Sequence, residues 1–143
     1  MGKAKWILAA LRIKPLDRIR LMKALFLVWR RSGGNVPDFF HFEPYLYGPC
    51  SFELYRVLRE LEEKGLIVQP PHPVQQWAKY YLTERGKAEA ESVSRHIDPG
   101  ILKKMEQAVD EVACLDFYAL LKKVYKEAPE FAVNSVMKEV LSR

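Results

Sequence analysis

The chain lacks the features that mark secreted, membrane-spanning and metal-binding proteins. Its 143 residues hold two cysteines, Cys50 and Cys114, in no Cys-x-x-Cys spacing, so neither a disulfide framework nor a paired metal motif is available. No apolar run approaches the roughly 18 residues of a membrane-spanning helix, and the apolar run near the N-terminus is too short for a signal peptide. We therefore predict a cytoplasmic protein with reduced thiols, no bound metal and no membrane association.

Residues that could support catalysis or hold a cofactor are equally sparse. Gly33 and Gly34 follow a predicted helix and lack the strand and lysine of a phosphate-binding loop. His41 and Cys50 are nine residues apart, and no third group or signature accompanies them. The sequence predicts that the protein is not an enzyme and has no cofactor.

Negative charge is scarce in the first part of the chain. The formal net charge is +5 with a pI near 9.2. All of the positive excess lies in residues 1–90, whereas residues 91–143 carry slightly more acidic than basic side chains. A basic excess in one part of a chain favours a polyanionic partner for that part.

Apolar periodicity and capping residues predict three helices before residue 65. The second helix, which Asp17 begins, has an apolar side and a basic side and ends at Gly33. In the third, Phe52 belongs to the apolar set, Cys50 or Ser51 is the cap, and Gly65 ends the helix. The expected ranges are 6–13, 17–31 and 52–64, with a loop or short strand rich in aromatic residues at 35–49.

A β-hairpin and further helices are expected beyond residue 65. The sequence predicts two strands, at residues 66–68 and 77–82, separated by a proline-containing turn. Four more helices are predicted at 84–95, 101–112, 117–126 and 130–141. Three helices followed by a hairpin are the order of a winged helix-turn-helix, so we predict a mainly α (α+β) fold. Residues 1–95 would form the winged-helix domain, and residues 96–143 a helical extension that packs back on the domain or forms the interface of a homodimer.

Three segments resemble known winged-helix families. LMKALFLVWRRSGG, FEPYLYGPCSFELYRVLRELEEKGLI and YYLTERGKA, within about residues 16–90, are similar to the YwgA-like and Panacea (antitoxin-associated) domains, and more distantly to PadR- and MarR-type regulators. The shared pattern is a helix with K-x-L-F-L, an aromatic loop, a Y-G-P-x-S break before the third helix, and a wing strand that runs into L-T-E-R-G. The resemblance implies a DNA-binding transcriptional regulator, or an antitoxin or adaptor that binds a partner protein.

In the DNA-binding interpretation the third helix enters the major groove of double-stranded DNA. Arg56 and Arg59 are predicted to read bases. Four glutamates on the same helix oppose a polyanion, and intrahelical pairs such as Arg56 with Glu60 are an alternative use of both arginines.

Two further sets of side chains would contact the DNA backbone. The basic side of the second helix and one wing residue are the expected phosphate ligands: Arg20, Lys23, Arg30, Arg31 and Lys79. The expected contacts at the tip of the wing are His72, Gln75 and Gln76. Solvated polar faces are the alternative for both sets.

The competing interpretation is a protein-interaction module of the antitoxin or adaptor kind. It would present Tyr45, Tyr47, Glu60 and Glu63 to a toxin or another protein. The aromatic residues of the loop at 35–49 are otherwise expected to pack in the core. An acidic third helix favours a protein partner, and a basic second helix favours DNA.

Overall fold

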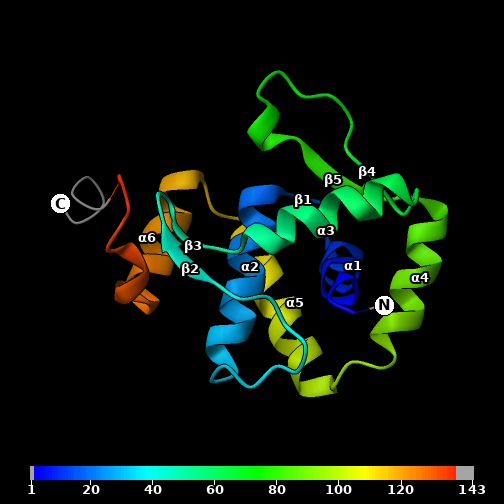
Figure 1. Cartoon of the computed structure of the whole chain (residues 1–143), viewed down its shortest axis with the longest axis horizontal. Coiled ribbons are helices and arrows are strands. Elements are labelled where there is room, and N and C mark those ends of the chain that lie inside the picture. The colour runs from blue at the N-terminus through cyan, green and yellow to red at the C-terminus, as the bar shows by residue number, and fades with distance from the viewer. Residues whose placement is uncertain (1, 138–143) are drawn as a thin grey trace.

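The computed structural model describes residues 2–137 (Figure 1). Its helices are α1 (Ala4–Ile13), α2 (Arg18–Arg31), α3 (Phe52–Glu63), α4 (Glu84–Ser94), α5 (Pro99–Ala113) and α6 (Phe117–Glu127), with short 3-10 turns at Gln75–Trp77 and Pro129–Ala132. Its strands are β1 (Leu16–Asp17), β2 (Glu43–Tyr45), β3 (Gly48–Cys50), β4 (Ile67–Val68) and β5 (Lys79–Leu82). The predicted fold class is confirmed: the chain is mainly helical, with a small antiparallel wing after the third helix.

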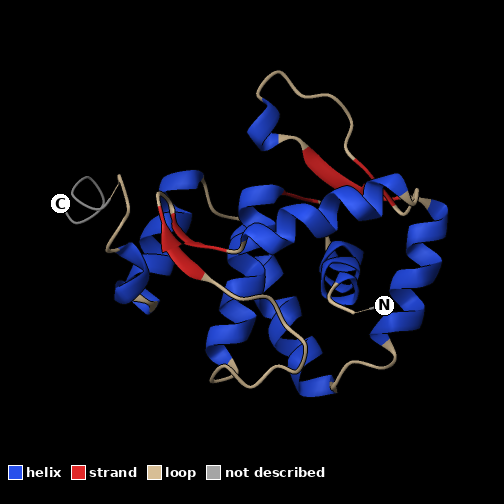
Figure 2. Cartoon of the chain, in the orientation of Figure 1, coloured by secondary structure: helices blue, strands red, loops and turns tan. Residues whose placement is uncertain are grey.

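The wing sheet has three strands in the order β1-β5-β4, all antiparallel (Figure 2). Leu16 pairs with Tyr80, and Ile67 pairs with Leu82, so the chain before α2 joins the hairpin that follows α3. The sequence did not predict β1, because two residues between Pro15 and a helix cap are too few to show a strand pattern. The predicted wing strand at 77–82 was too long by two residues, since Trp77 lies in a 3-10 turn.

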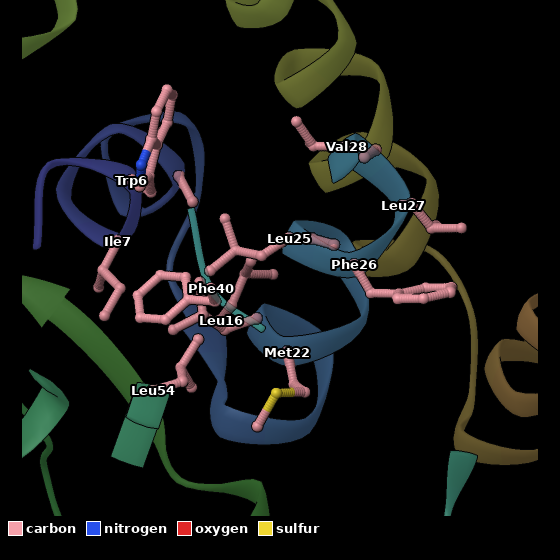
Figure 3. Packing of buried hydrophobic residues seen from close by; sticks show 14 of the residues in the cluster. Trp6, Ile7, Leu16, Met22, Leu25, Phe26, Leu27, Val28, Phe40 and Leu54 are labelled. Atoms are coloured by element: carbon pink, nitrogen blue, oxygen red, sulfur yellow. The ribbon is translucent and has the colours of Figure 1, made fainter. Parts of the chain in front are cut away.

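Helix α1 is the centre of the fold. Its residues from Trp6 to Leu11 are all buried, and α2, α3, α4 and α5 all contact it. A short helix that is apolar on every side is stable only when other elements surround it. Figure 3 shows Ile7, Leu16, Leu25 and Phe40 converging beside α1 and α2 in this core.

Side-chain caps begin four of the helices. The Asp17 carboxylate accepts a hydrogen bond from the Arg20 amide at 2.9 Å, and Thr83, Asp98 and Asp116 accept equivalent bonds at α4, α5 and α6. Each cap satisfies an amide that has no partner inside its own helix. Helix α3 is followed by Gly65 at φ +72°, the left-handed conformation expected of a glycine after a helix.

The C-terminal helices pack back on the winged helix. Their apolar residues, including Met105, Val109 and Leu121, belong to the same buried cluster as α1 and α2. Helix α5 packs against α2 (Figure 1), and Arg31 of α2 pairs with Glu111 of α5 at 2.6 Å and with Glu127 of α6 at 3.0 Å. Most of the apolar surface that suggested a dimer interface is therefore covered within one chain over the described residues, although Val136 stays exposed.

The helix predicted at residues 130–141 is wrong in its first part. Pro129–Ala132 is a 3-10 turn, and residues 133–137 are not helical. Phe131 is buried, and its ring centroid lies 4.8 Å from that of Phe26 on α2. This packing determines the conformation of the segment, and the helix that its apolar periodicity predicted does not form. Residues 138–141 of the prediction lie outside the described residues.

Replacing Arg31 by methionine is expected to lower the free energy of unfolding by about 1 kcal/mol, because Glu111 and Glu127 lose a shared, half-buried partner. The measurement is chemical denaturation followed by far-UV circular dichroism and by tryptophan fluorescence. All three tryptophans lie before residue 95. Since one core spans the chain, both signals should give the same single transition in wild type and variant; separate transitions would show that the helical extension folds independently.

Candidate functional site

Two of the segments that carry the family resemblance meet at one buried hydrogen bond. The Lys23 Nζ atom, on α2, donates to the carbonyl oxygen of Pro49 on β3 at 2.9 Å. Next to it, the Ser51 amide lies 3.2 Å from the Met22 sulfur. The turn before Pro49 needs Gly48, whose φ is +90° and whose missing side chain leaves room for the Tyr125 ring. The K-x-L-F-L helix and the Y-G-P-x-S break are thus one structural unit.

Lys23 was wrongly predicted to bind phosphate. Its exposed fraction is 4%, and its ammonium points into the protein instead of toward solvent. Among the described residues no carboxylate lies within ion-pair distance of it. Burial lowers the pKa of Lys23 from 10.5 to about 8, against a smaller opposing effect of the Cys50 thiol.

A pocket of about 210 Å³ lies beside this lysine. It is formed by the N-terminal part of α2, the β2–β3 turn and the start of α3. The residues that line it are Arg18, Ile19, Met22, Lys23, Tyr45, Leu46, Tyr47, Gly48, Cys50, Phe52, Tyr55 and Gln76. We call it the Lys23 pocket. Burial raises the pKa of Cys50 and of Tyr55. The lysine is consequently the group here whose ionisation changes near pH 8.

Large apolar side chains surround the mouth of the Lys23 pocket. Phe52 is 54% exposed, Tyr45 45%, Tyr47 44% and Leu46 43%. The rings of Tyr45 and Phe52 are in edge contact, with centroids 5.1 Å apart, although the residues come from β2 and α3. We call these four residues the aromatic rim. The loop residues Phe39, Phe40 and Phe42 pack in the core as predicted, whereas Tyr45 and Tyr47 of the same loop do not.

Helix α3 presents a mixed stripe to solvent. Phe52, Arg56, Arg59 and Glu63 repeat at spacings of three and four residues, so they share one face of the helix. Arg56 pairs with Glu60 at 2.7 Å and with Glu53 at 3.5 Å, which is the intrahelical alternative to base reading. Arg59 and Glu63 are exposed. The apolar side expected for Phe52 was the wrong one, because α3 packs through Leu54, Val57, Leu58 and Leu61.

The other α2 residues that were predicted to bind phosphate are already occupied. Arg20 bonds to Asp17 at 2.8 Å and to the Leu115 carbonyl at 2.7 Å. Arg30 pairs with Glu130, and Arg31 with Glu111 and Glu127. Burial alone would lower the pKa of Arg31, but the hydrogen bonds that Arg31 donates to Glu111 and Glu127, and the charges of these two carboxylates, outweigh burial and raise it. The side of α2 that was predicted to lie on DNA faces the C-terminal segments of the same chain.

The wing leaves its polar side chains in solvent. His72, Gln75, Gln76 and Lys79 are all exposed. Gln75 bonds to Gln69 within the hairpin at 3.1 Å, and the His72 ring accepts from the Val74 amide at 2.9 Å. The wing thus holds its own shape, and Lys79 remains available to a partner.

Nothing in the described part of the chain suggests a metal site, and none of its helices has the length and hydropathy to cross a membrane. No protein-family profile matches the chain, and no curated protein matches it. The function of this chain is therefore inferred from the geometry of its own residues.

Three parts of the site were not predicted from the sequence: Phe52 and Leu46 in the aromatic rim, and Arg18 in the Lys23 pocket. Phe52 directly follows Ser51, which occupies the N-cap position of α3 without a side-chain capping bond. Phe52 also lies two residues before Leu54, the first buried leucine of α3, and this offset is a sign that Phe52 points to a different side of the helix. No local pattern marks Leu46 or Arg18, since the contact between hairpin and helix brings them together.

Proposed function

We propose that the chain is a protein-interaction module of the antitoxin or adaptor kind, whose partner protein binds the aromatic rim. The observation that carries the proposal is the exposure of Tyr45, Leu46, Tyr47 and Phe52 around one pocket. Clustered exposed apolar side chains mark binding surfaces, and tyrosine and phenylalanine are enriched at the centres of protein interfaces. A cytoplasmic location, in which Cys50 and Cys114 stay reduced, fits this role.

Charge supports the same proposal. The basic side of α2 is occupied within the chain, which removes the main electrostatic argument for a polyanion. From Ser51 to Lys64 the third helix carries more acidic than basic residues. A protein that offers apolar side chains to the rim and a lysine or arginine to Glu63 complements this surface.

The experiment is to isolate the partner and rebuild the complex. The tagged full chain is purified from its own cells, co-purifying proteins are identified, and each is produced separately. The proposal predicts that one of them forms a defined complex in size-exclusion chromatography, and that nuclease treatment leaves this complex intact. Loss of every complex on nuclease treatment would show that nucleic acid was the link and would contradict the proposal.

Reversing the charge of Glu63 is expected to weaken the complex about tenfold. Glu63 is exposed on the stripe that begins at Phe52, so Glu63→Lys would bring two like charges together at the interface. The matched control is Glu84→Lys, an exposed change at the start of α4. Titration calorimetry with the rebuilt partner gives both affinities, and an equal loss in the two variants would remove Glu63 from the interface.

Double-stranded DNA is the second candidate, and one observation favours it. Arg59, Lys64 and Lys79 are exposed, and none of them forms an ion pair within residues 2–137. These side chains, from α3, the turn after it and β5, are available to phosphates or bases. We expect transcriptional regulation as the role if this candidate is correct.

Two phosphate contacts from Lys64 and Lys79, or three if Arg59 also binds phosphate, would make the binding constant for DNA fall with salt at a logarithmic slope of about −2 or −3. The measurement is fluorescence anisotropy with the upstream DNA of the protein's own gene and with a scrambled duplex, between about 50 and 200 mM salt. Lys64→Ala should reduce the slope by about one on both duplexes, whereas Arg59→Ala should cost about 1 kcal/mol or more on the upstream DNA alone if it reads a base. A flat salt dependence would rule out this mode of binding.

A further inference from the structure

The ammonium of Lys23 is buried without a counter-charge. The residue is 4% exposed, and the one acceptor that its Nζ atom reaches among the described residues is the neutral Pro49 carbonyl. An ammonium has three donors, and moving it from water into an apolar site is costly unless an anion accompanies it. The fold maintains this arrangement in the wall of a pocket rather than in a sealed core. A ligand can therefore supply the negative charge that the protein itself does not place beside Lys23.

The rest of the pocket lining also lacks negative charge. Its two charged residues, Arg18 and Lys23, are both cationic, and no carboxylate lines it. Glu43 of β2 contributes to raising the pKa of Cys50, but it does not line the pocket. Apolar walls come from Ile19, Met22, Leu46 and Phe52. Apolar walls around a few fixed polar groups are the usual make-up of small-ligand sites.

We propose that the Lys23 pocket binds a small organic carboxylate with an apolar body, whose carboxylate pairs with Lys23 and Arg18. The apolar body would lie between Met22, Leu46 and the Phe52 ring. A volume of about 210 Å³ admits a ligand of the size of a single substituted ring or a branched short-chain acid. This inference goes beyond the proposed partner surface, because the pocket and its lysine are present in the chain alone.

Protonation provides a signature of this site. In the free protein the pKa of Lys23 is about 8, so near pH 8.5 most of the lysine is neutral. A bound carboxylate favours the charged form and raises this pKa, so binding draws a proton from the buffer. The other titratable groups facing the pocket are Tyr45, Tyr47, Tyr55 and Cys50; burial raises the pKa of Cys50 from 9.0 and that of Tyr55 from 10.0. Because the pKa values of Cys50 and Tyr55 lie above that of Lys23, the proton taken up near pH 8.5 is bound by Lys23.

The test is titration calorimetry of the full chain with benzoate and phenylacetate, and with benzamide and phenylacetamide as neutral controls of the same shape. Each acid should bind at least about tenfold more tightly than its amide. Near pH 8.5, buffers of different ionisation enthalpy should report uptake of about 0.7 proton. Affinity should also fall as the pH rises above 8. Equal binding of acid and amide, or binding without proton uptake, would overturn the proposal.

Two variants and one control assign the binding to the pocket. Lys23→Met retains most of the length of the side chain without its charge, so it should abolish proton uptake and weaken binding of the acid at least about tenfold. Arg18→Met changes a half-buried pocket residue without touching the Lys23–Pro49 bond, so it also tests the site if the first variant fails to fold. Lys64→Met, an exposed change outside the pocket, should bind as wild type does. The proposal would be overturned if both variants bound the acids with wild-type affinity. If only Arg18→Met folds, wild-type affinity in that variant alone would overturn it. Absence of binding of either acid to the wild type at about 10 mM would also overturn it.

Discussion

Replacing Phe52 and Tyr45 together by serine is expected to weaken partner binding by a factor of about 100 or more, which corresponds to about 3 kcal/mol. The two rings are in edge contact at the centre of the aromatic rim, and both are about half exposed. Such neighbouring aromatic side chains dominate interface energetics once a partner covers them. The measurement is the dissociation constant of the rebuilt complex.

The matched control for this prediction is Tyr81→Ser. Tyr81 is 41% exposed on β5, next to the pocket between Leu11, Pro15 and Lys87 and away from the rim. The free energy of unfolding should change little in either variant, since all the removed rings are partly solvated in the free chain. An unchanged dissociation constant in the Phe52 and Tyr45 double variant, with folding intact, would place the partner elsewhere on the protein.

Replacing Lys23 by methionine is expected to change how stability depends on pH. The pKa of Lys23 is about 8 in the folded protein and 10.5 in its ordinary state, so between these values the unfolded chain binds more protons than the folded one. Folding stability from this group therefore rises with pH, beginning near pH 8. The unfolding free energy of wild type relative to Lys23→Met should increase by about 2–3 kcal/mol between about pH 8 and pH 10.

Comparison with the variant isolates the lysine in this experiment. Burial raises the pKa of Cys50, Tyr55, Tyr80 and Tyr125, and these groups lower stability as the pH rises through their ordinary values of 9.0 to 10.0 and above. They are present in both proteins, so most of their effect is removed by taking the difference. Denaturant titrations at several pH values provide the free energies. A difference that stays constant with pH would mean that Lys23 is not buried as a titrating ammonium.

Local signals in the sequence predicted the frame of the fold. Asp17 was correctly predicted to begin α2, because a cap bonds to an amide only a few residues away. The order of helices and wing followed from periodicity and turn residues. The residues of the predicted protein-binding surface, Tyr45 and Tyr47, are indeed exposed, although their binding role stays a prediction.

What could not be predicted depends on contacts between distant segments. A helical projection placed Lys23 with Arg20 and Arg30 on a polar side of α2, but this helix is covered by α1 and also by α5 and α6. Leu27 lies on the same side and is fully buried, and it was the one sign in the sequence that this side faces protein. The Lys23 pocket exists because the β2–β3 turn folds over α2, and no pattern along the chain encodes that contact.

Binding of a protein to the aromatic rim can be detected by site-specific photo-crosslinking in living cells, with a benzophenone amino acid at position 52 and, as the control, at position 81. Both positions carry exposed aromatic rings in the native chain. We expect one protein adduct from position 52 that is absent from position 81 and that survives nuclease treatment. Adducts to nucleic acid from position 52, or the same adducts from both positions, would contradict the assignment of the aromatic rim as a protein-binding surface.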